Sequence, residues 1–225
     1  MSKLYLRTIR SAIFGLVALA VLIFVPAGTI NYWQGWAFLG TFVFSTLIIT
    51  VYLARNDPKL LERRLSAGPQ AEKEPVQKII VALIIFLFAG LLVFSALDWQ
   101  FHWSPVPHWV SIAGDLLIFL SYIFFIWVFR ANSYAASTIQ VTEEQKVVST
   151  GPYAFVRHPM YTGALVMLAG IPLALGSWWG LFFFFLTMPV LMWRLSDEER
   201  FLRQNLPGYT EYTQQVRYRL IPSVW

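Results

Sequence analysis

Long stretches without charged side chains constrain this chain more than any other feature. A hydrocarbon core of about 30 Å needs roughly 20 helical residues to cross it. Six stretches of about that length occur, at residues 11–30, 33–54, 79–97, 109–129, 159–175 and 178–193, and Asp115 is the only acidic or basic residue inside them. The chain is 57% hydrophobic and 13% charged, which excludes an ordinary water-soluble domain. The sequence therefore predicts an all-α polytopic bundle of about six transmembrane helices.

The basic residues are segregated along the chain. If the N-terminus lies in the cytoplasm, all 17 Lys and Arg residues fall in the inner segments, which are residues 1–10, 55–78, 130–158 and 194–225. The outer turns carry none, so the distribution of the basic residues, which give the chain its net charge of +5, follows the positive-inside rule. A nucleic-acid-binding surface would gather the basic residues into one patch instead. We expect a multi-pass protein with both termini in the cytoplasm and no nucleic-acid partner.

Other chemistries find little support in the sequence. The first apolar stretch follows Lys3, Arg7 and Arg10 as a secretory signal does, but it is long and lacks a small-residue cleavage site, so we interpret it as a retained span. There is no cysteine, and three histidines without an HExxH spacing make a metal site unexpected. Asp115 is a functional candidate because intramembrane acids are costly, although hydration from the outer side is an alternative.

The chain divides into two regions of different character. Residues 1–130 form a predicted scaffold of four spans, and residues 131–225 hold a cytosolic loop, a helical hairpin and a polar tail. The segment 55–78 mixes charges with leucines, which fits either a short helix in the headgroup layer or a solvated connector. The amphipathic tail is either a lid over a site or an interfacial anchor.

The hairpin collects the polar residues. The turn "LGSWWG" is short enough to make its two helices antiparallel, so their inner ends are neighbours. Pro159 suits a first helical turn, and His158 and Tyr161 share a face where free N–H groups favour an anionic group. Arg194 and Glu198 share a face of the next helix. Each residue alone fits a headgroup anchor, but their convergence at one depth indicates a site.

Two motifs in residues 140–222, "VVSTGPYAFVRHPMYTG" and "DEERFLRQNLPGYTEY", resemble the isoprenylcysteine carboxyl methyltransferase family and the related phospholipid N-methyltransferases. The resemblance implies a bacterial-type member that binds S-adenosylmethionine at the cytosolic ends of its last helices. It places Arg194 where the prenylcysteine enzymes hold the substrate carboxylate. The implied cofactor-binding residues are Gln140, Lys146, Val147, Val148, Tyr153, His158, Pro159, Met160, Tyr161, Glu198 and Glu199.

The resemblance implies an S-adenosylmethionine-dependent methyltransferase of the bacterial inner membrane, of the carboxyl O-methyltransferase type. Its expected acceptor is an isoprenylcysteine-like carboxylate that enters from the bilayer, and the fork of Arg194 would orient it. The main alternative is N-methylation of phosphatidylethanolamine, whose ammonium must first lose a proton to Glu198, Glu199 or Tyr161. A sterol-reductase-like NADPH enzyme and a non-catalytic membrane protein are two further alternatives.

Overall fold

The computed structural model describes residues 2–142 and 144–225, and within these ranges every regular element is a helix. This confirms the predicted all-α bundle. The six longest helices are α1 (Ser2–Ala27), α2 (Trp33–Asn56), α4 (Pro75–Phe101), α5 (His108–Ala131), α6 (Pro159–Ala174) and α7 (Gly180–Asn205). Shorter elements connect them or follow them, namely α3 (Pro58–Leu65), η1 (Pro69–Ala71), η2 (Gly151–Ala154) and α8 (Tyr209–Gln215).

Five of these helices are long and apolar enough to cross a membrane, and they are α1, α2, α4, α5 and α7. They make the chain an integral membrane protein, as the sequence predicts. The predicted span at 159–175 is the apolar helix α6, which has only 16 residues and is therefore about 24 Å long at 1.5 Å per residue. Pro159 begins α6 and Gly176, with φ of 70°, follows its end, so α6 falls short of a full bilayer crossing.

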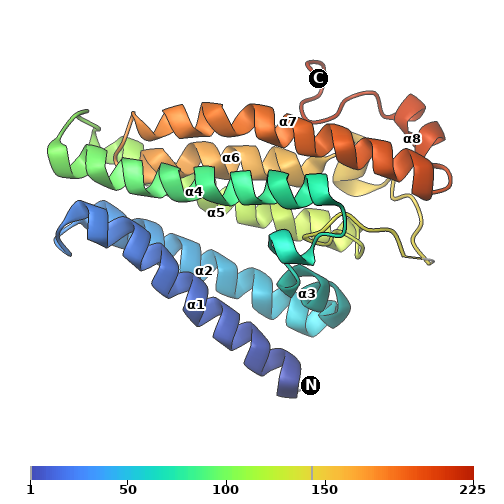
Figure 1. Ribbon diagram of the computed structural model, residues 1–225, viewed down its shortest axis with the longest axis horizontal. Coiled ribbons are helices and arrows are strands. Elements are labelled where there is room, and N and C mark those ends of the chain that lie inside the picture. Colours follow the sequence, from blue (N-terminus) through green and yellow to red (C-terminus); the bar gives the residue numbers. More distant parts are fainter. Residues whose placement is uncertain (1, 143) are drawn as a thin grey trace.

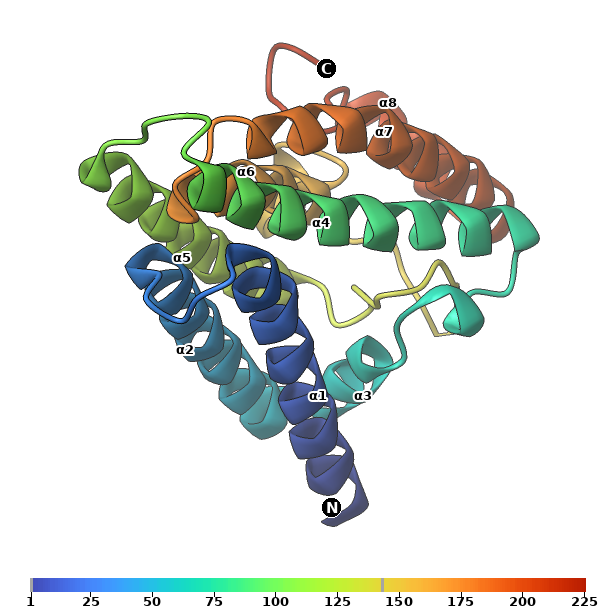
Figure 2. The same cartoon turned by 60° about the vertical axis from the view of Figure 1, so that its left-hand side comes forward.

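The long helices run back and forth between two ends of the bundle (Figure 1). We call one the turn end, because the short connections 28–32, 102–107 and 175–179 lie there. The other is the cavity end, and it holds both chain termini, α3, α8 and the loop 132–158 (Figure 2). Helix α4 packs along α7, α5 along α6, and α1 and α2 pack below them.

Glycines bring α5 and α6 into direct backbone contact. A Cβ atom at Gly114 would lie 2.3 Å from the backbone nitrogen of Ala174, and one at Gly163 would lie 2.6 Å from the ring of Phe125. Any larger residue at these positions would push the helices apart. Small residues allow such close packing inside a membrane. The contact fixes the start of α6, and with it the polar motif, against the cavity end of α5.

Within the segment 55–78, residues Pro58–Leu65 form the short helix α3. Asp57 caps α3 by accepting a hydrogen bond from the backbone N–H of Leu60 at 3.0 Å. Leu60 and Leu61 are buried in a cluster with Val128 and Phe129 of α5. The helix alternative is therefore confirmed, and the packing of α3 on α5 brings this segment to the cavity.

A buried carboxylate holds the turn end together. Asp98, with no exposed surface, accepts hydrogen bonds from the backbone N–H of Ser104 at 2.9 Å, from its hydroxyl at 2.6 Å and from the hydroxyl of Ser177 at 2.5 Å. The backbone N–H of Trp179 donates a further bond at 3.3 Å. Asp98 thus ties the end of α4 to the turn that precedes α7.

Candidate functional site

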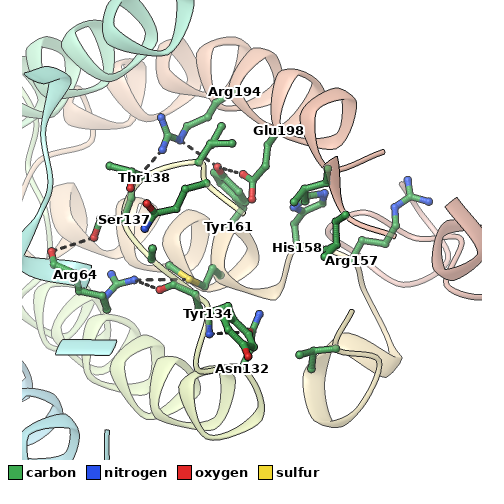
Figure 3. Close-up of a pocket in the computed structure, with 18 of the residues that line it drawn as sticks. Arg64, Asn132, Tyr134, Ser137, Thr138, Arg157, His158, Tyr161, Arg194 and Glu198 are labelled. Carbon is green, nitrogen blue, oxygen red and sulfur yellow. Dashed lines mark hydrogen bonds between the residues drawn. The ribbon is translucent and has the colours of Figure 1, made fainter. Parts of the chain in front are cut away.

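A cavity of about 520 Å³ opens at the cavity end, between α3, α4, α6, α7, α8 and the loop 132–148 (Figure 3). Ten of the twelve residues predicted from the sequence line it, including both members of the predicted pair Tyr161 and Glu198. They are Gln140, Lys146, Val147, Val148, Tyr153, His158, Met160, Tyr161, Arg194 and Glu198. Pro159 and Glu199 do not line this cavity.

The starts and ends of the hairpin helices meet where the sequence places them. Helix α6 begins at Pro159, as predicted, with His158 before it. The Tyr161 hydroxyl donates a hydrogen bond to Oε2 of Glu198 at 2.5 Å, and Nε of Arg194 donates one to the same hydroxyl at 3.1 Å. This confirms that α6 and α7 bring their polar residues to one point. The other oxygen of Glu198 accepts no hydrogen bond from a described residue.

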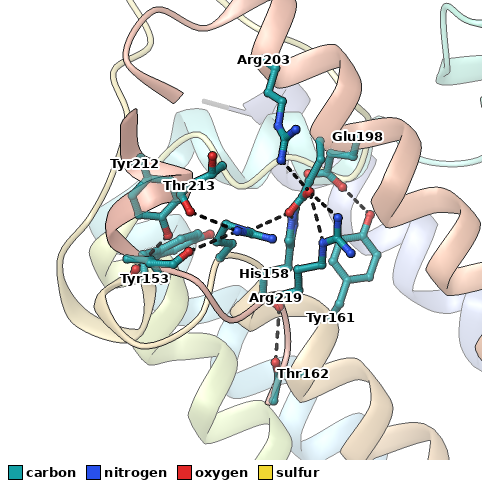
Figure 4. A network of polar contacts seen from close by, with 12 residues as sticks. Tyr153, His158, Tyr161, Thr162, Glu198, Arg203, Tyr212, Thr213 and Arg219 are labelled. Atoms are coloured by element: carbon teal, nitrogen blue, oxygen red, sulfur yellow. Dashed lines mark hydrogen bonds and ion pairs between the residues drawn. The ribbon is translucent and has the colours of Figure 1, made fainter. Parts of the chain in front are cut away.

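Glu199 does not line the cavity, and its carboxylate contacts three arginines and His158. Its carboxylate lies 2.8 Å from Nε of Arg157 and 3.2 Å from Nε2 of His158, and only 3% of its side chain is exposed. Arg203 and Arg219 complete the group at 3.5 Å and 3.2 Å (Figure 4). Such a carboxylate has no free oxygen for a ligand. Its contact with the cavity is indirect, because it holds His158 in place from behind.

The polar tail pairs with the start of α6, although none of its residues 213–225 lines the cavity. The backbone N–H groups of Arg157 and His158 donate to the carbonyls of Tyr218 and Arg219, both at 2.9 Å. The Thr162 hydroxyl donates to the carbonyl of Leu220 at 2.7 Å. The tail therefore pairs with the backbone around the start of α6. The sequence gives no signal for this contact, because backbone N–H and carbonyl groups are the same in almost every residue type.

Helix α8 and the turn η2 form an aromatic wall of the cavity. Tyr209 and Tyr212 of α8 line it, and the Tyr212 hydroxyl donates to the carbonyl of Tyr153 at 2.8 Å. Burial, reinforced by the charge of Glu198, raises the pKa of Tyr153 to about 12, so its hydroxyl stays protonated near neutral pH. Tyr209, Tyr212 and Leu206 pack in an apolar cluster with Val147. This corner offers flat apolar surfaces to a ligand.

Arg194 does not present a free fork to the cavity. Its Nη2 lies 2.8 Å from Oε1 of Glu72, and its Nη1 donates to Oε1 of Gln77 at 2.9 Å. Nη2 also donates to the carbonyl of Ser137 at 3.1 Å. Only 8% of Arg194 and 3% of Glu72 are exposed. The guanidinium for which the family resemblance implies a substrate carboxylate therefore already holds a carboxylate of its own chain.

Sequence reasoning missed Glu72 and Gln77. Glu72 stands in the segment that leads into α4, where it is one acid among several charged residues, and Gln77 lies in the first turn of α4. Glu72 also accepts from the backbone N–H of Ile139 at 3.2 Å and so joins its segment to the loop 132–148. The only available signal was that an arginine at this depth needs a counter-charge.

The described residues contain no group of three His, Asp or Glu side chains that could hold a metal ion. Asp115 lies on α5 at a distance from the cavity lining, and its buried Oδ1 has no hydrogen-bond partner among these residues. The structure therefore gives Asp115 no link to the site.

One comparison with known proteins bears on the part of the site that α6 and α7 supply. Residues 109–207 match the model of the phospholipid methyltransferase family. The match begins at the start of α5, earlier than the two motifs, and runs through α6 and α7 with the residue pair Tyr161 and Glu198 inside it. Residues 109–207, which are 99 of the 225 residues, are thus similar to a phospholipid methyltransferase domain, and they lie in a chain with five helices that are long and apolar enough to cross a membrane.

Proposed function

We propose that the protein transfers a methyl group from S-adenosylmethionine to a lipophilic acceptor that enters the cavity from the bilayer. The observation that carries this proposal is the two-sided lining of one cavity. Polar and aromatic residues form one wall, while Val81, Ile84 and Ile85 of α4, with Leu191 of α7, form an apolar wall. Ile85 is 50% exposed and the adjacent Phe86 of α4 is 70% exposed, so we place the entrance for the acceptor along this side of α4.

The residues of the polar wall fit the cofactor. The free oxygen of Glu198 can accept hydrogen bonds from an ammonium or from ribose hydroxyls. Val147 and the tyrosines of α8 would hold the flat adenine, and the faces of Tyr153 and Tyr161 suit a sulfonium cation. The bound cofactor supplies an already activated methyl group, so the chain's own contribution is alignment and exclusion of water.

The pairing of Arg194 bears on the acceptor. An isoprenylcysteine-like carboxylate, the acceptor expected for the carboxyl O-methyltransferase type, would have to displace Glu72 to reach the guanidinium. The amine of a phospholipid such as phosphatidylethanolamine needs no such displacement, because an amine does not compete with Glu72 for the guanidinium of Arg194. The match to phospholipid methyltransferases points the same way. We therefore place the phospholipid amine first and the carboxylate second.

We also propose that the cavity end faces the cytoplasm of a bacterial cell and that the protein resides in the inner membrane. The support is the positive-inside asymmetry, since both termini and the basic segments lie at this end. The chain has no cysteine, so single cysteines report its orientation cleanly. A membrane-impermeant maleimide should label Pro105→Cys in spheroplasts and should label Gln204→Cys only after lysis. The reverse pattern would contradict this orientation.

Binding and turnover test the proposed reaction. Purified protein in detergent should release heat on titration with S-adenosylmethionine and none with NADPH, and should transfer labelled methyl groups to phosphatidylethanolamine. Binding of NADPH alone would support a reductase, and binding of neither would support a non-catalytic protein. A farnesylcysteine analogue serves as the competing acceptor.

The variant Glu72→Gln tests the choice of acceptor. It removes the charge that balances Arg194 while keeping a hydrogen-bond acceptor at the same place. We expect labelling to shift from phosphatidylethanolamine toward the carboxylate of the farnesylcysteine analogue. A wild-type protein that already prefers this analogue would reverse our order of acceptors.

A further inference from the structure

Four cationic side chains line the cavity, and they differ in what neutralises them. Arg157 lies 2.8 Å from Glu199 and Arg194 lies 2.8 Å from Glu72, so both charges are balanced inside the chain. Lys146 is exposed to solvent at the cavity mouth. Arg64 is the fourth, and no carboxylate among residues 2–142 and 144–225 forms an ion pair with it.

The guanidinium of Arg64 is held in place but not saturated. Its Nη1 donates to the carbonyl of Ala135 at 3.0 Å and lies 3.8 Å from Sδ of Met160. The guanidinium carbon also lies 4.5 Å from the ring centre of Phe129. Nε and Nη2 donate to none of the described residues. Two donors of a positioned fork thus remain available to a ligand in the cavity.

Burial makes this charge costly without a counterion. Desolvation lowers the pKa of Arg64 to about 10, so the side chain is still protonated at neutral pH. A desolvated cation gains more from a bound anion than an exposed one does, because water no longer competes. The guanidinium fork matches the paired oxygens of a phosphate or carboxylate.

The place of Arg64 in the cavity favours the acceptor over the cofactor. The side chain comes from α3. Ala67 and Gly68, which also line the cavity, lie between α3 and α4, and α4 supplies the apolar wall. Figure 3 shows Arg64 on the far side of Tyr161 from His158 and Arg157. Because α3 directly follows α2, a helix long and apolar enough to cross a membrane, Arg64 lies just beyond the end of such a helix, where the anionic part of a lipid would lie.

We infer that Arg64 binds the anionic group of the lipid acceptor, either the phosphodiester of a phospholipid or the carboxylate of an isoprenylcysteine-like molecule. This inference rests on the proposed function and assigns its acceptor specificity to α3. Arg64 is then the residue that distinguishes lipids with an anionic group near the methyl-accepting atom from lipids without one.

Arg64→Ala and Arg64→Lys test the inference, with Arg63→Ala as the matched control. Arg63 lies next to Arg64 on α3 and donates a hydrogen bond to the carbonyl of Ser133, but it does not line the cavity. Acceptor KM, kcat and cofactor affinity are measured with phosphatidylethanolamine and with the farnesylcysteine analogue in mixed micelles. Native mass spectrometry measures retention of each acceptor independently of turnover.

Arg64→Ala should raise the acceptor KM roughly tenfold to hundredfold, as expected for the loss of a charge-assisted hydrogen bond. Cofactor affinity and kcat should stay near the wild-type values, and so should the acceptor KM of the Arg63→Ala control. The acceptor KM of Arg64→Lys, which keeps the positive charge, should lie between those of the wild type and Arg64→Ala. The acceptor whose KM responds identifies the bound anion.

Several outcomes would overturn the inference. One is an unchanged KM and unchanged retention of both acceptors in Arg64→Ala. Another is a loss of cofactor affinity in Arg64→Lys as large as the loss of acceptor binding, since Arg64 would then serve the cofactor. If the wild type transfers no methyl group, the proposed function fails, and retention of acceptor by wild type but not by Arg64→Ala would still support the anion site.

Discussion

The two ends of the bundle use buried carboxylates in different ways. At the turn end, Asp98 is fully buried and both of its oxygens are occupied by donors from neighbouring turns. At the cavity end, Glu198 is half-buried, and one of its oxygens has no partner among the described residues. Glu199 lies at the same end but resembles Asp98, because arginines and His158 surround it.

This difference separates residues that hold the fold from residues that are available to a ligand. A carboxylate whose oxygens are filled by its own chain cannot bind anything else, and its removal leaves several buried donors unpaired. A carboxylate with a free oxygen toward a cavity contributes less to folding and more to binding. Glu198 and Glu199 should therefore differ sharply although they are adjacent in the sequence.

The largest effect is expected for Glu199→Ala. The change leaves Arg157 as a buried cation without its partner and frees His158, and removal of one partner of a buried pair costs about 3–5 kcal/mol. The free energy of unfolding, measured by denaturant titration in detergent micelles, should fall by that amount. Cofactor affinity should fall with it, because His158 lines the cavity.

The control for this change is Arg200→Ala on the same helix turn. The Arg200 side chain is 68% exposed and, among the described residues, forms an ion pair only with Asp197, at 3.4 Å, so its loss should be almost neutral. If Glu199→Ala were as stable as Arg200→Ala, Glu199 would not be the one of the two adjacent glutamates that stabilises the fold.

An intermediate effect is expected for Asp98→Asn at the turn end. The amide keeps one accepting oxygen but weakens the bonds from Ser104 and Ser177, at a cost of about 1–3 kcal/mol in unfolding free energy. Methyl transfer by the folded variant, measured with labelled cofactor, should equal that of the wild type because the cavity lies at the other end. A loss of turnover without a loss of stability would contradict the conclusion that Asp98 acts on the fold and not on the site.

Most of the fold could be predicted from the sequence because it follows from local properties. Uninterrupted apolar stretches give the helices, and the short turn "LGSWWG" makes α6 and α7 neighbours. That adjacency and a four-residue spacing on α7 were enough to bring Tyr161 to Glu198. The bounds of α6 were also predicted to within one residue, but at 16 residues this helix is shorter than the five that are long enough to cross a membrane.

The rest depends on packing between distant segments. Adjacent residues on a helix point about 100° apart, so Glu198 and Glu199 are separated only by the rotation of α7, which its neighbours set. Glu72 reaches Arg194 from a loop far away in the chain, and the tail reaches His158 through backbone groups. No local pattern encodes either contact, and so the occupied state of Arg194 was not foreseen.

The smallest effect on stability is expected for Glu198→Gln, and it sharpens the comparison most. Glutamine keeps an oxygen for the Tyr161 hydroxyl, so the free energy of unfolding should change by no more than about 0.5 kcal/mol. The lost charge should weaken S-adenosylmethionine binding by about tenfold or more in calorimetry, since hydrogen bonds to a charged acceptor are about twice as strong as neutral ones. If Glu198→Gln instead loses as much stability as Glu199→Ala while its cofactor affinity is intact, the free oxygen of Glu198 does not mark a ligand site, and the contrast between filled and open carboxylates fails as a guide to this protein.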